Sequence, residues 1–160
     1  MTILLQAIEF LGLSLWLGSD VFLSFVVAPG AFRILASRDQ AGTMVGYGLW
    51  SMHMIGVVCG IAILLARLLR TRTFASLATP AALCVVLMML LTVVSQHWVS
   101  PKMAGLRVQM GSIQATAADN PLLVEFSRLH RISVSLESGV LLAGLVALYL
   151  MVRDVATARG

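Results

Sequence analysis

The chain has 160 residues, of which 59% are hydrophobic and only 11% are charged. Soluble globular domains carry about 45–50% apolar and about 25% charged residues, so this composition, with a mean hydropathy of +0.96, excludes a water-soluble domain. The formal net charge of +4 does not indicate nucleic-acid binding, because the basic residues stand in short clusters between apolar runs, where positive residues flank membrane spans.

Four apolar runs are long enough to cross a bilayer, which needs about 20 residues. They cover residues 3–27, 44–68, 74–99 and 121–152, and they predict one all-α domain over residues 1–160, an integral membrane four-helix bundle. We expect Pro29 to kink or end the first span, because a proline inside a helix removes a hydrogen bond. The fourth run exceeds the bilayer, so its first two turns should project beyond the lipid.

The connection between the third and fourth spans, residues 100–120, has an amphipathic pattern. Apolar residues recur at helical spacing: Met103, Leu106, Met110 and Ile113. This pattern is typical of an interfacial helix that lies on the membrane, or of an extension of the third span. Asn120 and Pro121 then predict the cap and the first turn of the last helix.

Four spans place both termini on one side of the membrane. The arginines of the tight second connection, Arg67, Arg70 and Arg72, favour the cytoplasm for that side. We expect a bacterial inner (plasma) membrane protein in contact with the lipid bilayer.

Ionisable residues inside the spans cost free energy in lipid and therefore need a partner, a cavity or a function. Counting helical rise from the span centres places Asp20, His53 and Glu137 at one depth, about 5 Å beyond the midplane. Glu9 stands alone on the opposite side of the midplane. Three interpretations of the trio remain open: a buried hydrogen-bonded network that sets helix register, a proton relay or ion site, and a metal site.

Two further histidines, His97 and His130, lie at a second depth about 14 Å from the midplane, together with Gln96. They are either interfacial residues or the axial ligands of a b-type haem held between the third and fourth spans. A haem would imply electron transfer or porphyrin chemistry. No nucleophile–base spacing, phosphate loop or HExxH motif is present in the sequence, so an enzyme is not favoured.

Several segments occur in a familiar order: Leu15-Trp16-Leu17-Gly18, Phe25-Val26-Val27-Ala28-Pro29, Ser100-Pro101-Lys102-Met103 and Phe126-Ser127-Arg128-Leu129-His130-Arg131-Ile132-Ser133. This order resembles the transmembrane protein 205-like family, four-helix membrane proteins whose domain has no known function. The resemblance covers nearly the whole chain and implies that the family's signature positions are Trp16, Gly18, Pro29, Pro101, His130 and Ser133. Asp20, His53 and Glu137 depart from that pattern, so their chemistry would be particular to this protein.

The leading functional hypothesis is a small non-enzymatic membrane protein, either free-standing or an accessory subunit of a larger membrane complex. A subunit would bury one lipid-facing side against its partner through small residues such as Gly139, Ala143 and Gly144. The alternatives are the haem protein with His97 and His130, and transport of protons or metal ions through Asp20, His53 and Glu137.

Overall fold

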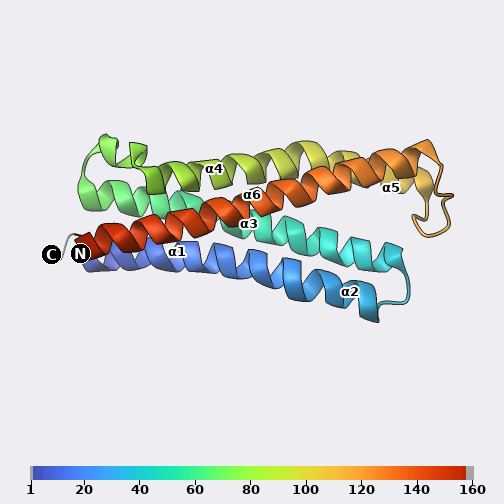
Figure 1. Cartoon of the computed structure of the whole chain (residues 1–160), viewed down its shortest axis with the longest axis horizontal. Coiled ribbons are helices and arrows are strands. Elements are labelled where there is room, and N and C mark those ends of the chain that lie inside the picture. The colour runs from blue at the N-terminus through green and yellow to red at the C-terminus, as the bar shows by residue number, and fades with distance from the viewer. Residues whose placement is uncertain (1, 158–160) are drawn as a thin grey trace.

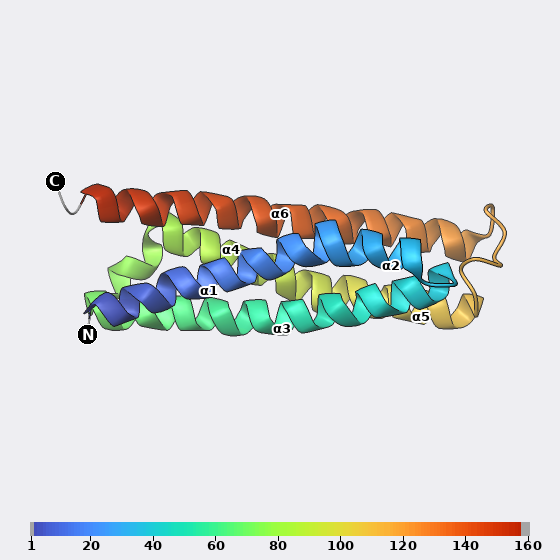
Figure 2. The same cartoon turned by 90° about the horizontal axis from the view of Figure 1, so that it is seen from below.

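The computed structural model describes residues 2–157 and shows an antiparallel bundle of four long helical spans (Figure 1; Figure 2). No strand occurs in this part of the chain. A continuous apolar run in lipid must satisfy its own backbone hydrogen bonds, which a helix does and an open strand does not. The elements are α1 (Thr2–Phe22), η1 (Leu23–Val27), α2 (Ala28–Ile34), α3 (Arg38–Thr71), η2 (Phe74–Ala78), α4 (Pro80–Val94), η3 (Ser95–Val99), α5 (Ser100–Met110) and α6 (Pro121–Thr157).

The first and third spans are compound helices, each with a π-helical turn directly before a proline-led segment. η1 and η3 are π turns, and Pro29 and Pro101 lie in the first turn of α2 and α5. A proline ring clashes with the carbonyl group four residues earlier in a regular helix, and a π turn pairs its amides one residue further back. The wider turn therefore carries the helix past the proline. Two backbone hydrogen bonds identify the π turns: Ala28 N–H donates to Leu23 O, and Ser100 N–H donates to Ser95 O.

Three predicted span boundaries are corrected, two of them at the ends of the spans that contain the π turns. The first span does not end near Val27 or Pro29 but continues to Ile34. The third span begins at Pro80, because residues 74–78 form a short 3-10 helix outside it, and it continues through α5 to Met110. Both views show α5 along the axis of α4 (Figure 1; Figure 2), so of the two predictions for residues 100–110 the extension holds and the helix lying on the membrane does not.

The four spans pair as two helical hairpins, and each hairpin begins at the same end of the bundle (Figure 1). The closest packing is between α1 and α3 in the first hairpin and between α4 and α6 in the second. The hairpins meet through α3 with α4 and α1 with α6. The start of α1 and the end of α6 lie together at one end, called here the terminal end, as an even number of spans requires (Figure 1).

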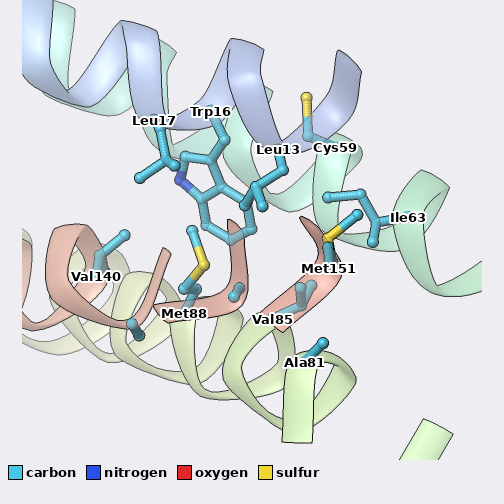
Figure 3. Close-up of a cluster of buried hydrophobic side chains, with 12 residues drawn as sticks. Leu13, Trp16, Leu17, Cys59, Ile63, Ala81, Val85, Met88, Val140 and Met151 are labelled. Atoms are coloured by element: carbon cyan, nitrogen blue, oxygen red, sulfur yellow. The ribbon is translucent and has the colours of Figure 1, made fainter. Parts of the chain in front are cut away.

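A cluster of buried apolar side chains from all four spans fills the half of the bundle nearer the terminal end (Figure 3). Trp16 is its largest member and is fully buried. Its indole lies against Gly56 of α3, where an added Cβ would collide with it, and close to Gly60. Glycine is needed at Gly56 because the indole occupies the space of a side chain.

The opposite end of the bundle is held by the carboxylate of Asp39, in the first turn of α3. It accepts hydrogen bonds from Ser112 Oγ at 2.6 Å and from Ile113 N–H at 2.8 Å. Asn120 Oδ1 accepts from Leu122 N–H at 2.9 Å, as the predicted helix cap requires. The connection over residues 111–120 is therefore fastened both to the first hairpin and to α6.

The helices are longer than the hydrocarbon layer. α6 has 37 residues, about 55 Å of helix, against about 30 Å of hydrocarbon. Aromatic residues typical of the lipid–water interface occur at one level, where Trp50 stacks with Tyr47 and Lys102 lies over Trp98. α5 and the start of α6 extend past this level, away from the terminal end.

Candidate functional site

His53 occupies the centre of a buried hydrogen-bonded network with Ser95, Gln96 and Glu137, and these residues together with the nearby buried Asp20 are called here the imidazole layer. The imidazole is fully buried. Its Nε2 lies 2.8 Å from Glu137 Oε1, and its Nδ1 lies 2.9 Å from Gln96 Oε1. Ser95 Oγ donates to the same Glu137 oxygen at 3.0 Å. Three spans thus converge on one imidazole.

Asp20, on α1, brings the remaining span to this layer. Its side chain is 1% exposed, and Oδ1 accepts a hydrogen bond from Ser24 Oγ at 3.2 Å. The other oxygen, Oδ2, is buried without a partner among the described residues, and so is Glu137 Oε2. Buried carboxylate oxygens usually find partners. These two leave acceptor capacity unused in the interior of the bundle.

Both π turns lie at this layer. η3 begins at Ser95 and carries Gln96, and η1 carries Ser24 one turn after Asp20. π turns inside α-helices are frequent at functional sites, because the extra residue rotates the side chains that follow. Here the prolines require the turns, and the turns present polar side chains to His53 and Asp20.

A second polar cluster, called here the ionic layer, lies at the terminal end and consists of Glu9, Arg67, Arg70 and Asp154. Glu9 is 1% exposed and accepts two hydrogen bonds from Arg70, at 2.6 Å from Nε and 3.2 Å from Nη2. Arg67 lies 3.6 Å from Glu9 and 3.7 Å from Asp154, and its Nε donates to the Ser76 carbonyl. The two guanidinium charges are balanced by two carboxylates. The prediction that Glu9 stands alone is therefore wrong.

The ionic layer borders a cavity of about 270 Å³ between α1, α3 and α6. Gln6, Phe10 and Met151 complete its lining together with the charged groups. The cavity brings polar surface to Glu9 from the terminal end but does not reach the imidazole layer.

An apolar plug separates the two layers. Glu9, Trp16 and Asp20 share one face of α1, and between the two acids Leu13, Trp16 and Leu17 pack into the core (Figure 3). The Trp16 indole N–H is buried without a partner among the described residues. The indole therefore lies between the two layers.

The structure brings together the predicted trio but gives no contact between the two histidines of the predicted haem pair. His53 and Glu137 are in direct contact, and Asp20 shares the layer. Among residues 2–157, no three His, Cys, Asp or Glu side chains gather closely enough to hold a metal ion. His97 on η3 and His130 on α6 are both exposed on the outside of the bundle.

The small residues expected to receive a partner subunit are already used inside the bundle. Ala143 is buried, an added Cβ at Gly144 would collide with Leu17, and one at Gly139 would crowd Leu91. They pack against α1 and α4. The predicted partner surface on these three residues is therefore wrong.

Sequence reasoning missed Ser95 and Ser24, and it placed Gln96 too near the surface. Gln96 was counted from a span ending at residue 99, whereas the third span runs from Pro80 to Met110 and is centred near Ser95. The sequence places Arg67 and Arg70 at the terminal side of the membrane but predicts no partner for either. The signal that could have predicted this pairing was Glu9, an acid within the neighbouring span for which the sequence showed no partner.

Comparison with known proteins identifies a family but not an activity. No curated protein and no solved structure matches the chain. The family model for a domain of unknown function, DUF4149, matches residues 11–112, which is more than half of the chain and includes Asp20, His53 and Gln96. Glu137 lies outside the matched segment. The chain therefore belongs to the family defined by this domain, DUF4149.

Proposed function

We propose that this chain is a small non-enzymatic membrane protein that conducts protons across the bilayer through its imidazole layer. The observation that carries the proposal is the position of His53, fully buried with one ring nitrogen on a carboxylate and the other on an amide. Histidine titrates between about pH 5 and 8 unless its surroundings shift it. A buried histidine of this kind inside a span is a functional group by default.

The surroundings of His53 accommodate two protonation states without moving the ring. As an imidazolium it donates from Nε2 to Glu137 and from Nδ1 to the Gln96 oxygen. When Nε2 passes its proton to Glu137, the neutral imidazole keeps the proton on Nδ1, which still donates to the Gln96 oxygen, and the protonated carboxyl of Glu137 donates back to Nε2. Gaining or losing one proton therefore needs no movement of the ring.

The unpaired oxygens of Asp20 and Glu137 supply the next positions for the proton. The proton would pass between Glu137, His53 and Asp20 and would cross the plug when Trp16 shifts. The finer resemblance to the transmembrane protein 205-like family adds Trp16 and Pro29 as signature positions, the plug residue and the proline behind the first π turn.

The test is proton movement into liposomes that contain the purified chain and a pH-sensitive dye, under a potassium diffusion potential. Wild-type liposomes should acidify faster than empty ones, and Glu137→Gln should return them to the empty rate. Glu125→Gln is the matched control, because Glu125 is an exposed carboxylate on the same helix, 3.6 Å from Arg128. Wild-type chain with no rate above that of empty liposomes would refute the proposal.

Purification in detergent separates a free-standing protein from an accessory subunit. Recovery of the chain alone favours the free-standing form, whereas co-purification with a partner favours the subunit, and the conduction test applies to the purified chain in either case. Reporter fusions at both termini test the predicted cytoplasmic location and the inner-membrane assignment. The haem prediction for His97 and His130 is tested by the absorption spectrum of protein purified from haem-producing cells, where a Soret band would support it.

A further inference from the structure

The two hairpins have the same internal organisation. Each consists of a compound helix with a π turn and a proline, followed by a long uninterrupted helix, and each begins at the terminal end (Figure 1). A shift of 72 residues carries Pro29 onto Pro101 and the π turn 23–27 onto 95–99. Few residues are identical under this shift, so the sequence alone shows no repeat.

The buried positions of the compound helices coincide under the same shift. Leu13, Trp16 and Asp20 fall on Val85, Met88 and Thr92, and all six are at most 1% exposed. Residue types differ, but the inward-facing positions agree. The compound helices therefore occupy equivalent places in the bundle.

The long helices also coincide, under a shift of 84 residues that carries His53 onto Glu137. The buried residues of α3 that fall on buried residues of α6 are Gly56 on Val140, Cys59 on Ala143, Gly60 on Gly144, Ile63 on Ala147 and Arg67 on Met151. His53 and Glu137, which hydrogen-bond to each other, are thus equivalent residues that meet between the hairpins.

The packing contacts of the two hairpins also correspond under these shifts. An added Cβ at Gly60 would meet Trp16 and Met89, and one at Gly144 would meet Met88 and Leu17. Under the shift of 72 residues, Trp16 corresponds to Met88 and Leu17 corresponds to Met89. Each glycine therefore receives one residue from its own hairpin and one from the other, as a two-fold axis along the bundle requires.

We infer that the chain consists of two equivalent helical hairpins and that the imidazole layer is two half-sites meeting at their axis, with Thr92 as the unrecognised counterpart of Asp20. One half-site is Asp20, Ser24 and His53, and the other is Thr92, Gln96 and Glu137. Parallel repeats related by an axis along the membrane normal are known to build binding centres at their interface. This inference rests on the proposed function for its role in proton transfer.

The state of Thr92 supports this assignment. Thr92 is 1% exposed, and its hydroxyl is buried without a partner among residues 2–157, as Asp20 Oδ2 is. A buried hydroxyl can accept a proton at its oxygen while releasing its own. Thr92 is therefore a positioning and relay residue on the Glu137 side, as Asp20 is on the His53 side.

The experiment exchanges the two flanking residues between the half-sites. Asp20→Thr should lower proton flux by about tenfold or more, the scale of a lost proton-transfer group. The double variant Asp20→Thr with Thr92→Asp should return flux to within about twofold of wild type. The second half-site then supplies the carboxylate, so the effects of the two substitutions on flux are not additive. Double-variant flux no higher than that of Asp20→Thr alone, in a protein that melts like the wild type, would overturn the inference.

A second pair of variants covers the case in which the exchange fails to fold. Thr92→Ser keeps the hydroxyl and should keep flux, whereas Thr92→Val keeps the shape and should lose most of it. Equal flux in Thr92→Val and wild type overturns the role of Thr92. The proposed function stands or falls separately on Glu137→Gln, so loss there without any effect at Thr92 would remove this inference alone.

Discussion

The two polar layers of the bundle contain similar residues in opposite states. In the ionic layer both Glu9 oxygens and both arginines have partners, at distances of 2.6–3.7 Å. In the imidazole layer two carboxylate oxygens and the Thr92 hydroxyl have none among the described residues. Charges that are fully paired resist change, because removing one partner leaves the other buried and uncompensated. Unpaired oxygens can still take a proton.

This contrast assigns a different task to each end of the bundle. The ionic layer fastens α1, α3 and α6 at the terminal end, and the apolar plug around Trp16 keeps that cluster apart from His53. Stability should therefore depend mainly on the ionic layer and the plug, and function mainly on the imidazole layer. Four substitutions test this division, from the largest expected loss of stability to the smallest.

Glu9→Gln should cost the most stability. It leaves the buried Arg67 and the half-buried Arg70 without their shared carboxylate, a loss of about 3–5 kcal/mol by analogy with broken buried ion pairs. Reversible unfolding in mixed micelles measures the free energy. Asp154→Asn is the control, because this side chain is 45% exposed and 3.7 Å from Arg67, so its loss should stay below about 1 kcal/mol. An equal loss of unfolding free energy in the two variants would mean that Glu9 does not hold α1 to α3.

Gly56→Ala should come next. The added Cβ would collide with the Trp16 indole, and overpacking of a filled core costs about 1–3 kcal/mol. Gly46→Ala is the matched control on the same helix, since nothing lies within 4 Å of its added Cβ, and alanine should stabilise this helix by up to about 1 kcal/mol. If both variants gained stability, the contact between Trp16 and Gly56 would not be tightly packed.

Asp20→Asn should leave the unfolding free energy within about 1 kcal/mol of wild type. Asparagine keeps the shape and can still accept the hydrogen bond from Ser24, but it cannot take up a proton. The same protein should lose proton flux in liposomes. A loss of stability as large as that of Glu9→Gln would erase the distinction between the two layers.

Asp39→Asn should have the most local effect, because it weakens only the fastening of residues 111–120. Those residues should become more sensitive to protease, while both layers and the melting temperature stay nearly unchanged. Asp119→Asn, an exposed carboxylate in the same connection, is the control. Protease resistance equal to that of wild type would show that other contacts hold the connection.

Much of the architecture could be predicted from the sequence. Apolar run length is a direct consequence of bilayer thickness, and it indicated four helical spans with both termini at one end. Helical rise was enough to place His53 and Glu137 at the same depth, and they are in contact. These are properties of single helices, which need no knowledge of packing.

What could not be predicted depends on how helices continue and face each other. Pro29 was expected to kink or end its span, and the predicted third span stops at residue 99, before Pro101, because the sequence does not show that a π turn can carry the helix onward. That continuation moved the centre of the third span and brought Gln96 to His53. The pairing of Glu9 with Arg67 and Arg70 likewise required the α1–α3 packing, because these residues are about 60 positions apart.

The spare length of the helices has a consequence outside the lipid. Some 20 Å or more of the roughly 55 Å of α6 finds no room in the hydrocarbon, and α5 and the connection pinned by Asp39 lie beside that surplus. The protein therefore presents a short helical extension to the aqueous compartment. Antibodies, cross-linkers and neighbouring ectodomains can reach this extension, so it can be labelled without disturbing the interior of the bundle.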